Sequence, residues 1–490
     1  MGRSKTPSHI LELEIQYDAK NPASVLEHLS NSARSVYNAC LGECVKRMNR
    51  LIQDPEYDVL KKEYANAKRK GLPVKDIRDR YKELNEKHGY TEYCLHTYAA
   101  QIRKHFPNFG IDEAQKQATR AFLAVERLRL GQAEKVRFHS KRDPMSFEGK
   151  SGRSKLHYDL KSRCLKYGEH LFKLKVKPND QYAMLCLMDE VKYVRVLKRI
   201  IRGKERWFCQ LILKGLPPDG QRHKTTYANE SGGIDPGVST VAFVSDTDAK
   251  LYELAPGCAE DEKAIRRIQR AMDRSRRATN PDNYNPDGTI KKGKLAWNYS
   301  KRYIRLKNKL KELYRQCKVR REVSHHILAK MILSKASFLK TEDMSYRGLA
   351  KRTKKTKKNK SNGKNISKKR YGKTVHARAP ARLIAILDQK LSYRGRSVER
   401  INTRKVRASQ YNPLDGTYQK KDLRDRMVSL GENTVVQRDL LSAYCIKHTV
   451  ITNDFIHPGS AYADFRTFKW LNDREVNRLR ETHTLSWYTS

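Results

Sequence analysis

The sequence predicts a multidomain α+β protein. Its 490 residues leave room for roughly two to four domains. Residues 11–17 alternate between apolar and polar as a half-buried strand does, a long helical stretch follows, and strand patterns return after residue 135. A linker rich in Pro, Gly and polar residues at 214–230 is then followed by a region with a different residue pattern. These changes predict a β domain interrupted by helices, with a separate domain after it.

The helical stretch extends from about residue 23 to residue 130 and is clearest at 112–130. The apolar residues at helical spacing there are Ala118, Phe122, Val125 and Leu128. The polar face of the same helix carries Lys116, Arg120, Arg127 and Arg129. This face is either solvated or in contact with RNA, and we include Lys116, Arg120 and Arg127 among the candidate nucleic-acid contacts.

Strands are expected at 170–177, 191–196 and 206–213, the last two joined as a hairpin by the turn-like residues 202–205. Beyond the linker, residue 234 begins a strand–turn–strand pattern. Long basic helices are then expected at 260–278 and 300–333. The second helix has an apolar stripe that we expect to pack in a core: Tyr303, Leu306, Leu310, Leu313 and Cys317.

The charge of the chain is strongly positive. It contains 103 Lys and Arg against 54 Asp and Glu, a formal net charge of +49. Such a field favours a polyanion, because neutralising phosphates releases condensed counterions. An anionic membrane is the competing partner, but the basic residues are spread along the whole chain, and no apolar stretch approaches the ~20 residues that span a bilayer. With no secretory signal pattern, we expect a soluble protein of the prokaryotic cytoplasm, associated with the nucleoid.

The cysteines argue against a structural zinc site. None of the nine forms a C-x-x-C pair, and no His/Cys cluster has zinc-finger spacing. Their odd number and scattered placement indicate reduced thiols in a reducing compartment. We therefore expect no zinc.

Residues 346–378 contain 14 Lys and Arg and no Asp or Glu. We expect this segment to order only on a nucleic-acid backbone, since it has little to bury. A localisation signal is the alternative for a short basic run, and this one is long and central. The candidate contacts within it are Lys354, Lys355, Lys357, Lys358, Lys368, Lys369 and Arg370.

Three carboxylates stand beside apolar segments in a chain that has few acidic residues. Asp235 ends a short apolar run before a Gly-containing turn, Glu342 closes the segment 336–342, and Asp439 lies where the pattern changes toward helix. Each could be a cap or a salt-bridge partner when taken singly. Hydrolysis of a phosphodiester by two metals needs several carboxylates from separate elements, and Mg²⁺ or Mn²⁺ prefers such oxygen ligands.

These motifs resemble those of the transposon-encoded TnpB nucleases and the related compact type V CRISPR effectors. G-I-D-P-G-V at 233–238, F-L-K-T-E-D-M at 338–344 and Q-R-D-L-L-S-A-Y at 437–444 are similar to the three RuvC motifs of that family. V-R-F-H-S-K-R at 136–142 and S-F-E-G-K at 146–150 are similar to its segment entering the β domain. The resemblance covers roughly residues 10–445.

The resemblance implies an oligonucleotide-binding wedge domain (1–30 and 136–225) interrupted by a helical recognition domain (31–135). An RNase H-like RuvC domain (226–445) and a C-terminal tail (446–490) follow. It further implies that Asp235, Glu342 and Asp439 hold the catalytic Mg²⁺ or Mn²⁺. The partners it implies are a guide RNA and double-stranded target DNA bearing a short motif read by the protein. We expect no membrane partner, and a monomer or homodimer.

The region between the second and third motifs departs from the family. Its members usually carry a zinc ribbon there, whereas residues 343–438 contain no cysteine, and an aromatic, polar stretch within 400–436 stands in its place. Relatives that bind DNA without cutting it lose one or more of the catalytic carboxylates. This chain retains all three, so a nuclease-inactive RNA-guided repressor is the alternative hypothesis, ahead of another RuvC-like nuclease or a passive RNA-binding protein.

Overall fold

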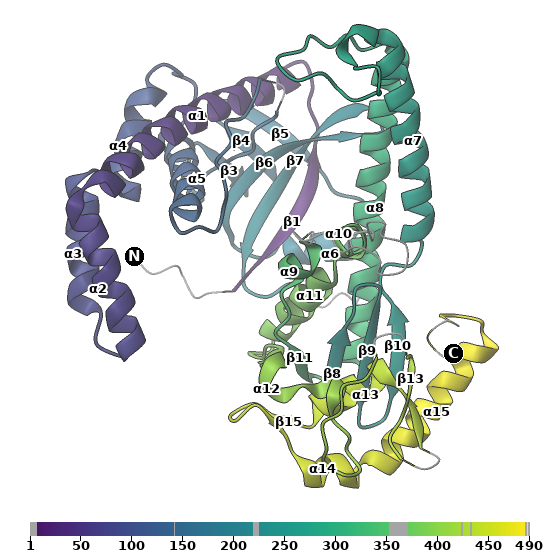
Figure 1. The fold of residues 1–490 in the computed structure, drawn as a ribbon. Helices are drawn as coiled ribbons and strands as arrows, with labels where there is room; N and C mark the ends of the chain where they lie inside the picture. The colour runs from purple at the N-terminus through teal and green to yellow at the C-terminus, as the bar shows by residue number, and fades with distance from the viewer. Residues whose placement is uncertain are drawn as a thin grey trace. The chain divides into compact units, whose positions relative to one another are not determined.

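The computed structural model describes residues 7–141, 143–218, 225–351, 371–422, 425–431, 434–485 and 488. The chain divides into two compact units, Met1–Gln221 and Arg222–Ser490, each with mixed α and β structure (Figure 1). In the described part of the chain, every helix is too short or too polar to cross a lipid bilayer.

The first unit is built on a curled antiparallel sheet with the strand order β2-β6-β7-β1-β5-β4-β3. Its strands are β1 (Ser8–Ile15), β2 (Phe147–Glu148), β3 (Leu156–Asp159), β4 (Cys164–Tyr167), β5 (His170–Lys175), β6 (Val191–Ile201) and β7 (Lys204–Lys214). β1 pairs with β7 on one side and with β5 on the other. The strands that flank the helical stretch therefore share one sheet, as the sequence predicts. The predicted hairpin is β6–β7, and its turn residues Arg202 and Gly203 both have positive φ, which matches the twist of the strands.

The helices of the first unit lie between β1 and β2 in the sequence, apart from a short helix before β6. They are α1 (Ala23–Gln53), α2 (Pro55–Lys70), α3 (Lys75–Lys87), α4 (Glu92–Arg103), α5 (Ile111–Arg129) and α6 (Gln181–Cys186). The predicted helix at 112–130 is α5. One core contains buried residues of both α1 and the sheet, such as Leu26 and Leu211. The segment leading to β2 is tied to α1, because Asn38 exchanges hydrogen bonds with the backbone of His139.

The second unit contains a five-stranded mixed sheet with the order β10-β9-β8-β11-β12. Its strands are β8 (Ser231–Pro236), β9 (Thr240–Ser245), β10 (Ala249–Glu253), β11 (Phe338–Glu342) and β12 (Glu399–Ile401). β9 runs antiparallel to β8 and β10, while β8, β11 and β12 run parallel to one another. Two short ribbons complete the β structure, β13 (Met427–Ser429) with β14 (Val435–Gln437), and β15 (Thr449–Val450) with β16 (Phe455–Ile456).

Helices fill the connections of this unit. They are α7 (Cys258–Thr279), α8 (Lys301–Leu333), α9 (Tyr346–Ala350), α10 (Gly372–Arg378), α11 (Pro380–Ser392), α12 (Thr403–Val406), α13 (Arg438–Lys447), α14 (Pro458–Ala463) and α15 (Phe465–Glu481), with short 3₁₀ turns at Pro281–Asn283 and Ala408–Gln410. α7 and α8 are the two predicted long basic helices and pack together as a hairpin (Figure 1).

The apolar stripe on α8 is not core, contrary to the sequence-based expectation. Its five residues, from Tyr303 to Cys317, are only half-buried along the contact with α7. The buried residues of α8 come later in the helix: His325, Leu328, Ala329, Ile332 and Leu333. The physical reason is that in a two-helix hairpin each helix covers only one side of the other.

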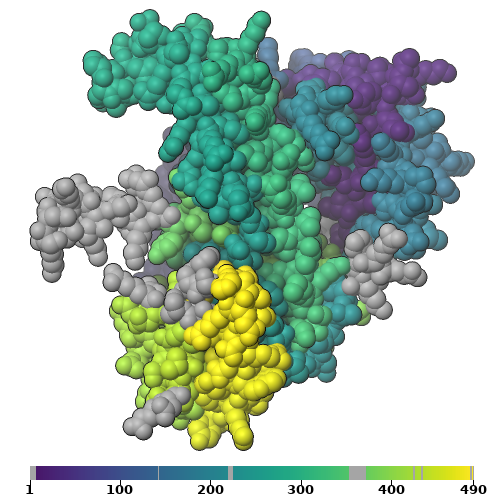
Figure 2. Space-filling model, turned by 90° about the vertical axis from the view of Figure 1, so that its right-hand side faces the viewer, coloured from purple at the N-terminus to yellow at the C-terminus, as the bar shows by residue number. Residues whose placement is uncertain are grey.

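The residues after 445 are an integral part of the second unit. Phe465, Phe468, Leu471 and Leu479 of α15 lie in the same core as Tyr444 of α13 and Leu251 of β10. Figure 2 shows these C-terminal residues in yellow, packed beside the yellow-green residues that precede them. The segment that the motifs leave without a role therefore completes this core.

Candidate active site

Strand register brings Asp235 and Glu342 side by side. β8 and β11 are parallel neighbours, and Ile234 is paired with Thr341, so the next residues along, Asp235 and Glu342, occupy adjacent positions. Paired positions on neighbouring strands lie about 5 Å apart and point to the same face of the sheet. Both carboxylates stand near the C-terminal ends of their strands, where the sheet holds them rigidly.

The third carboxylate comes from α13, which lies against β8. Asp439 is in the first turn of α13, and the side chain of Gln437 caps this helix by accepting a hydrogen bond from the Leu440 N–H at 2.7 Å. The close approach depends on Gly233. A Cβ atom there would lie 2.6 Å from the backbone nitrogen of Lys447 and closer still to the Ala443 carbonyl oxygen. Gly233, two residues before Asp235, thus allows α13, which carries Asp439, to pack closely against β8.

Burial opposes ionisation of the two strand carboxylates, and like charge adds to this effect at Asp235. The pKa of Asp235 is raised well above its ordinary value by burial, then by the negative charges of Glu342 and Asp439. A hydrogen bond from Ser442, three residues after Asp439 on α13, and the charge of Arg438 partly offset this effect. Burial raises the pKa of Glu342 to about 7. The charges of Glu342 and Asp439 therefore both act on Asp235, and a shared site for the three carboxylates stays a prediction.

Arginines neutralise Asp439. The guanidinium of Arg438 donates to Asp439 Oδ1 from Nη2 at 2.8 Å and from Nε at 3.1 Å, and Arg426 Nη1 lies 3.8 Å from Oδ2. Among the residues that the structure describes, no three or more His, Cys, Asp or Glu side chains form a group that could hold a metal ion. The donor set suits a hard cation chemically, since all three groups offer carboxylate oxygens. Coordination by all three would require Asp439 to turn from its arginines toward the strands.

Tyr346 is a neighbour that the sequence reasoning missed. It begins α9, four residues after Glu342, and its hydroxyl is buried with no hydrogen-bond partner among the described atoms. The pKa of this phenol is raised by burial and by the nearby charges of Asp235 and Glu342. Ser442 and Arg438 were also missed. Their only signal in the sequence is that they flank Asp439 within one helical turn.

The basic candidates on α5 differ in their surroundings. Arg127 is exposed, and Lys116 Nζ lies 5.2 Å from the centre of the Tyr193 ring. Arg120 is bound internally, because its guanidinium donates to the Ser146 carbonyl at 2.6 Å and to the Ser146 hydroxyl at 3.1 Å. A nucleic-acid role for these three stays a prediction. The candidates Lys354, Lys355, Lys357, Lys358, Lys368, Lys369 and Arg370 lie outside the described residues.

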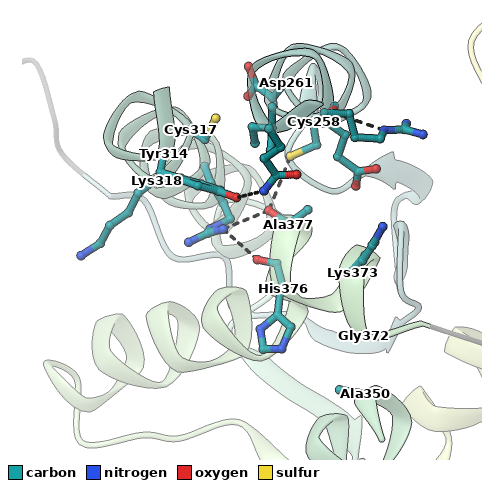
Figure 3. A pocket seen from close by; sticks show the side chains of 15 residues that line it. Cys258, Asp261, Tyr314, Cys317, Lys318, Ala350, Gly372, Lys373, His376 and Ala377 are labelled. Carbon is teal, nitrogen blue, oxygen red and sulfur yellow. Dashed lines mark hydrogen bonds between the residues drawn. The ribbon is translucent and has the colours of Figure 1, made fainter. Parts of the chain in front are cut away.

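The helices α9 and α10 are in close contact with each other. A Cβ atom on Gly372 of α10 would lie 2.9 Å from the carbonyl oxygen of Ala350 in α9. α10 is held in turn by the helical hairpin, since Arg321 of α8 donates to the carbonyls of His376 and Ala377 at 2.9 and 3.0 Å (Figure 3). A cavity of about 580 Å³ lies between α7, α8 and these helices. α9 and α10 therefore both lie beside the α7–α8 hairpin.

Comparison with known proteins finds likeness in structure alone. No protein-family model matches the chain, and no curated protein matches it. Among solved structures it is similar to the "Cryo-EM structure of the Cas12f1-sgRNA-target DNA complex" at 11% sequence identity and a TM-score of 0.47, covering 90% of this chain and 99% of that chain. It is also similar to the "Cryo-EM structure of CRISPR-Cas12f Ternary Complex" at 13% identity and a TM-score of 0.28, covering 87% of this chain and 81% of that chain. Cas12f1 is a compact type V effector, the class that the sequence motifs resemble.

Proposed function

We propose that this protein is an RNA-guided DNA endonuclease of the RuvC type, with Asp235, Glu342 and Asp439 as its catalytic carboxylates. The observation that carries the proposal is their convergence from three separate elements in a chain of net charge +49. Burying mutually repelling carboxylates costs stability, so such a group is a candidate functional site rather than a structural one. The strong positive charge supports nucleic acid as the substrate.

The carboxylate oxygens would hold Mg²⁺ or Mn²⁺, which when bound supplies electrostatic stabilisation of the attacking and leaving oxygens in phosphodiester hydrolysis. The other residues have positioning roles in this proposal. Ser442 fixes the orientation of Asp235 through its hydrogen bond, and Gly233 sets the distance between α13 and β8. Arg438 and Arg426 hold Asp439, and they can turn to a phosphate oxygen when Asp439 takes up a cation.

The arrangement of each unit supports the same proposal. In the second unit, three antiparallel strands followed by two parallel ones, with carboxylates at the ends of β8 and β11, suit the RNase H-like domain that the resemblance implies. In the first unit, one sheet interrupted by five helices suits a wedge domain with a helical recognition insertion. In this scheme the protein reads a short duplex motif, and the guide RNA reads the target by base pairing.

The alternative is a nuclease-inactive RNA-guided DNA-binding protein that acts as a repressor. Retention of all three carboxylates favours the nuclease. The deciding experiment purifies the protein with its bound RNA, sequences that RNA, and replaces its targeting stretch with a new sequence. The proposal predicts Mg²⁺-dependent cuts that move with the new sequence. Binding that moves with the guide and leaves the DNA intact would establish the repressor instead.

A further inference from the structure

A polar cavity of about 500 Å³ lies in the second unit, away from the carboxylates. It is lined by Thr225, Thr226, Tyr227, Asn229, Ser337, Arg394 and Arg396. Ser337 directly precedes β11, whereas Glu342 is the last residue of that strand. The length of the strand separates the two places, a distance of about 16 Å at the usual rise per residue. The cavity is therefore at the opposite edge of the sheet from the proposed active site.

The two arginines are held by a rigid turn at the end of α11. Gly395 has a φ of +69°, and the Arg396 N–H donates to the Leu391 carbonyl at 3.0 Å. This left-handed glycine with a bond spanning six residues is a Schellman motif, which fixes the chain direction after a helix. Arg394 and Arg396 flank the glycine, so their positions are set by the backbone.

Contacts with aromatic rings orient both guanidinium groups. Arg394 Cζ lies 5.2 Å from the centre of the Tyr227 ring, and Arg396 Cζ lies 4.0 Å from that of Phe338. Arg396 Nη1 also donates to the Ser337 hydroxyl at 2.7 Å. Phe338 itself is 44% exposed. An arginine stacked on a ring keeps its in-plane N–H groups available, and holding it there lowers the entropy lost when it binds a ligand.

The cavity carries positive charge that the described residues do not neutralise. No Asp or Glu lines it, and neither arginine forms an ion pair with a described carboxylate. Neighbouring arginines in the same region are paired: Arg382 of α11 with Glu322 at 2.9 Å, and Arg400 of β12 with Asp388 at 2.5 Å. This contrast indicates that the two guanidinium groups are available to bind an anion from outside the chain.

We infer that this cavity binds a phosphodiester group in the backbone of a nucleic acid. Two planar guanidinium forks suit phosphate oxygens, while Thr226, Asn229 and their neighbours offer further hydrogen-bond donors. The exposed ring of Phe338 beside the cavity provides a surface on which an adjoining base can stack. The inference deepens the proposed function by adding a second nucleic-acid contact at the far edge of the sheet. The inferred contact does not require the protein to cut DNA.

The test measures binding of a fluorescent single-stranded oligonucleotide at several salt concentrations. The Arg394→Gln/Arg396→Gln double variant should bind roughly tenfold more weakly, and the slope of log affinity against log salt should flatten by about one to two units, one per lost phosphate contact. Arg382→Gln is the matched control, because that arginine lies in α11, the helix that precedes the turn, and already has a carboxylate partner. Its slope should equal that of the wild type.

Two additional measurements distinguish a nucleic-acid backbone contact from loss of folding and from a free-phosphate site. The Arg394→Lys/Arg396→Lys variant keeps the charge at the helix end, so it should fold as the wild type does and keep most of the slope while losing several-fold in affinity. Inorganic phosphate at millimolar concentration should leave oligonucleotide binding nearly unchanged. Strong competition by phosphate together with an unchanged slope in the Gln variant would mean a free-phosphate site and would overturn the inference. At concentrations that saturate binding, the Gln double variant should still cut DNA. A wrong inference about this cavity can therefore be told apart from a wrong assignment of the active site.

Discussion

Asp235 and Glu342 place acidic groups where the surrounding protein disfavours their charge. Many described carboxylates are paired with arginine, such as Glu322 with Arg382 and Asp388 with Arg400. Asp235 and Glu342 are instead opposed by burial, and at Asp235 also by the charge of Glu342. Their ionised forms therefore destabilise the metal-free protein. Such local destabilisation is common where residues are arranged for function rather than for stability.

Glu342→Gln should stabilise the metal-free protein in a pH-dependent way. The pKa of Glu342 rises from an ordinary 4.5 to about 7 in the folded state, so the folded protein keeps a proton that the unfolded chain loses. The stabilising effect of that proton is fully present below pH 4.5 and is lost as the pH rises through about 7. The variant does not titrate there, so its advantage in unfolding free energy should grow across this window, to about 3 kcal/mol.

Thermal unfolding in a chelating buffer, followed from pH 4 to pH 8, measures this effect. Glu481→Gln, at the exposed end of α15, is the control and should follow the wild type at every pH. A difference between Glu342→Gln and the wild type that stays constant over the whole range would show that folding does not shift the pKa of Glu342.

At the scale of elements, local patterns predict the long helices and several of the strands. The alternation at 191–196 and 206–213 predicts the β6–β7 hairpin, and the spacing at 112–130 predicts α5. The motifs point to the three carboxylates, and in the structure the charges of Glu342 and Asp439 raise the pKa of Asp235. Their role as one site stays a prediction. Side-chain contacts between distant segments could not be predicted this way. The buried hydroxyl of Tyr346 and the arginine turn after α11 depend on which elements pack together, and a single sequence does not encode that locally.

Gly233→Ala tests the contact between α13 and β8. The added methyl group would overlap the backbone at Ala443 and Lys447, and backbone cannot move aside as a flexible side chain can. We expect a loss of about 1–3 kcal/mol in unfolding free energy. The rate of DNA cleavage should fall by more than the loss of folded protein explains, because α13 carries Asp439 and Ser442.

The matched control is Gly42→Ala in the helix α1, where a new methyl group would meet only the Phe138 ring at 3.8 Å. That variant should be as stable as the wild type or slightly more stable, since alanine favours helix. Equal stability and cleavage for Gly233→Ala and wild type would mean that the two elements do not pack this closely.

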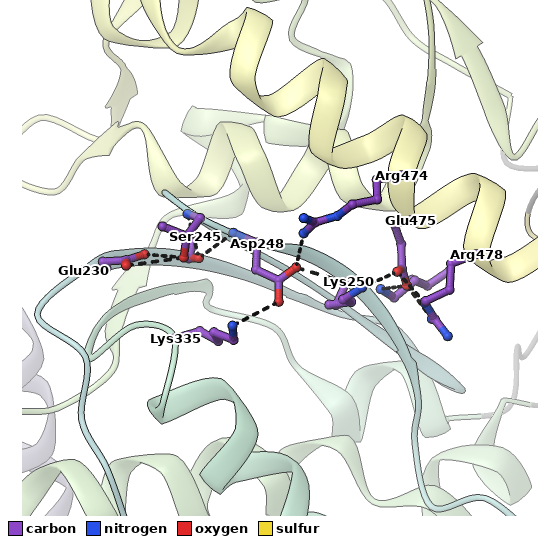
Figure 4. A network of polar contacts seen from close by, with 10 residues as sticks. Glu230, Ser245, Asp248, Lys250, Lys335, Arg474, Glu475 and Arg478 are labelled. Atoms are coloured by element: carbon purple, nitrogen blue, oxygen red, sulfur yellow. Dashed lines mark hydrogen bonds and ion pairs between the residues drawn. The ribbon is translucent and has the colours of Figure 1, made fainter.

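At the scale of the whole molecule, the C-terminal helix stabilises the unit that carries the site. Glu475 of α15 is fully buried and accepts hydrogen bonds from the Leu251 N–H at 3.1 Å and from Lys250 Nζ at 2.9 Å, both in β10 (Figure 4). Arg478 donates to the same carboxylate at 2.6 and 2.7 Å. A second link joins Arg474 to Asp248 at 3.0 Å. These bonds connect α15 to the edge strand of the sheet.

Glu475→Ala should therefore destabilise the second unit although it lies far from the three carboxylates in sequence. The change leaves a buried backbone N–H and two cations without their acceptor, which costs about 2–4 kcal/mol. Chemical denaturation of the full chain measures the loss, with Glu481→Gln again as the exposed control. Unchanged unfolding would show that α15 docks without this carboxylate.

The most direct test of the proposed active site compares cutting and binding in Asp235→Ala. The substitution removes one carboxylate from the proposed site and leaves the basic surfaces untouched. With guide RNA and Mg²⁺, we expect cleavage of target DNA to fall by about a thousandfold or more. Binding of RNA and target should stay within a few-fold of the wild type, and Asp282→Ala, an exposed acid between α7 and α8, should cut normally. Undiminished cutting by Asp235→Ala would contradict the assignment of these three carboxylates as the active site.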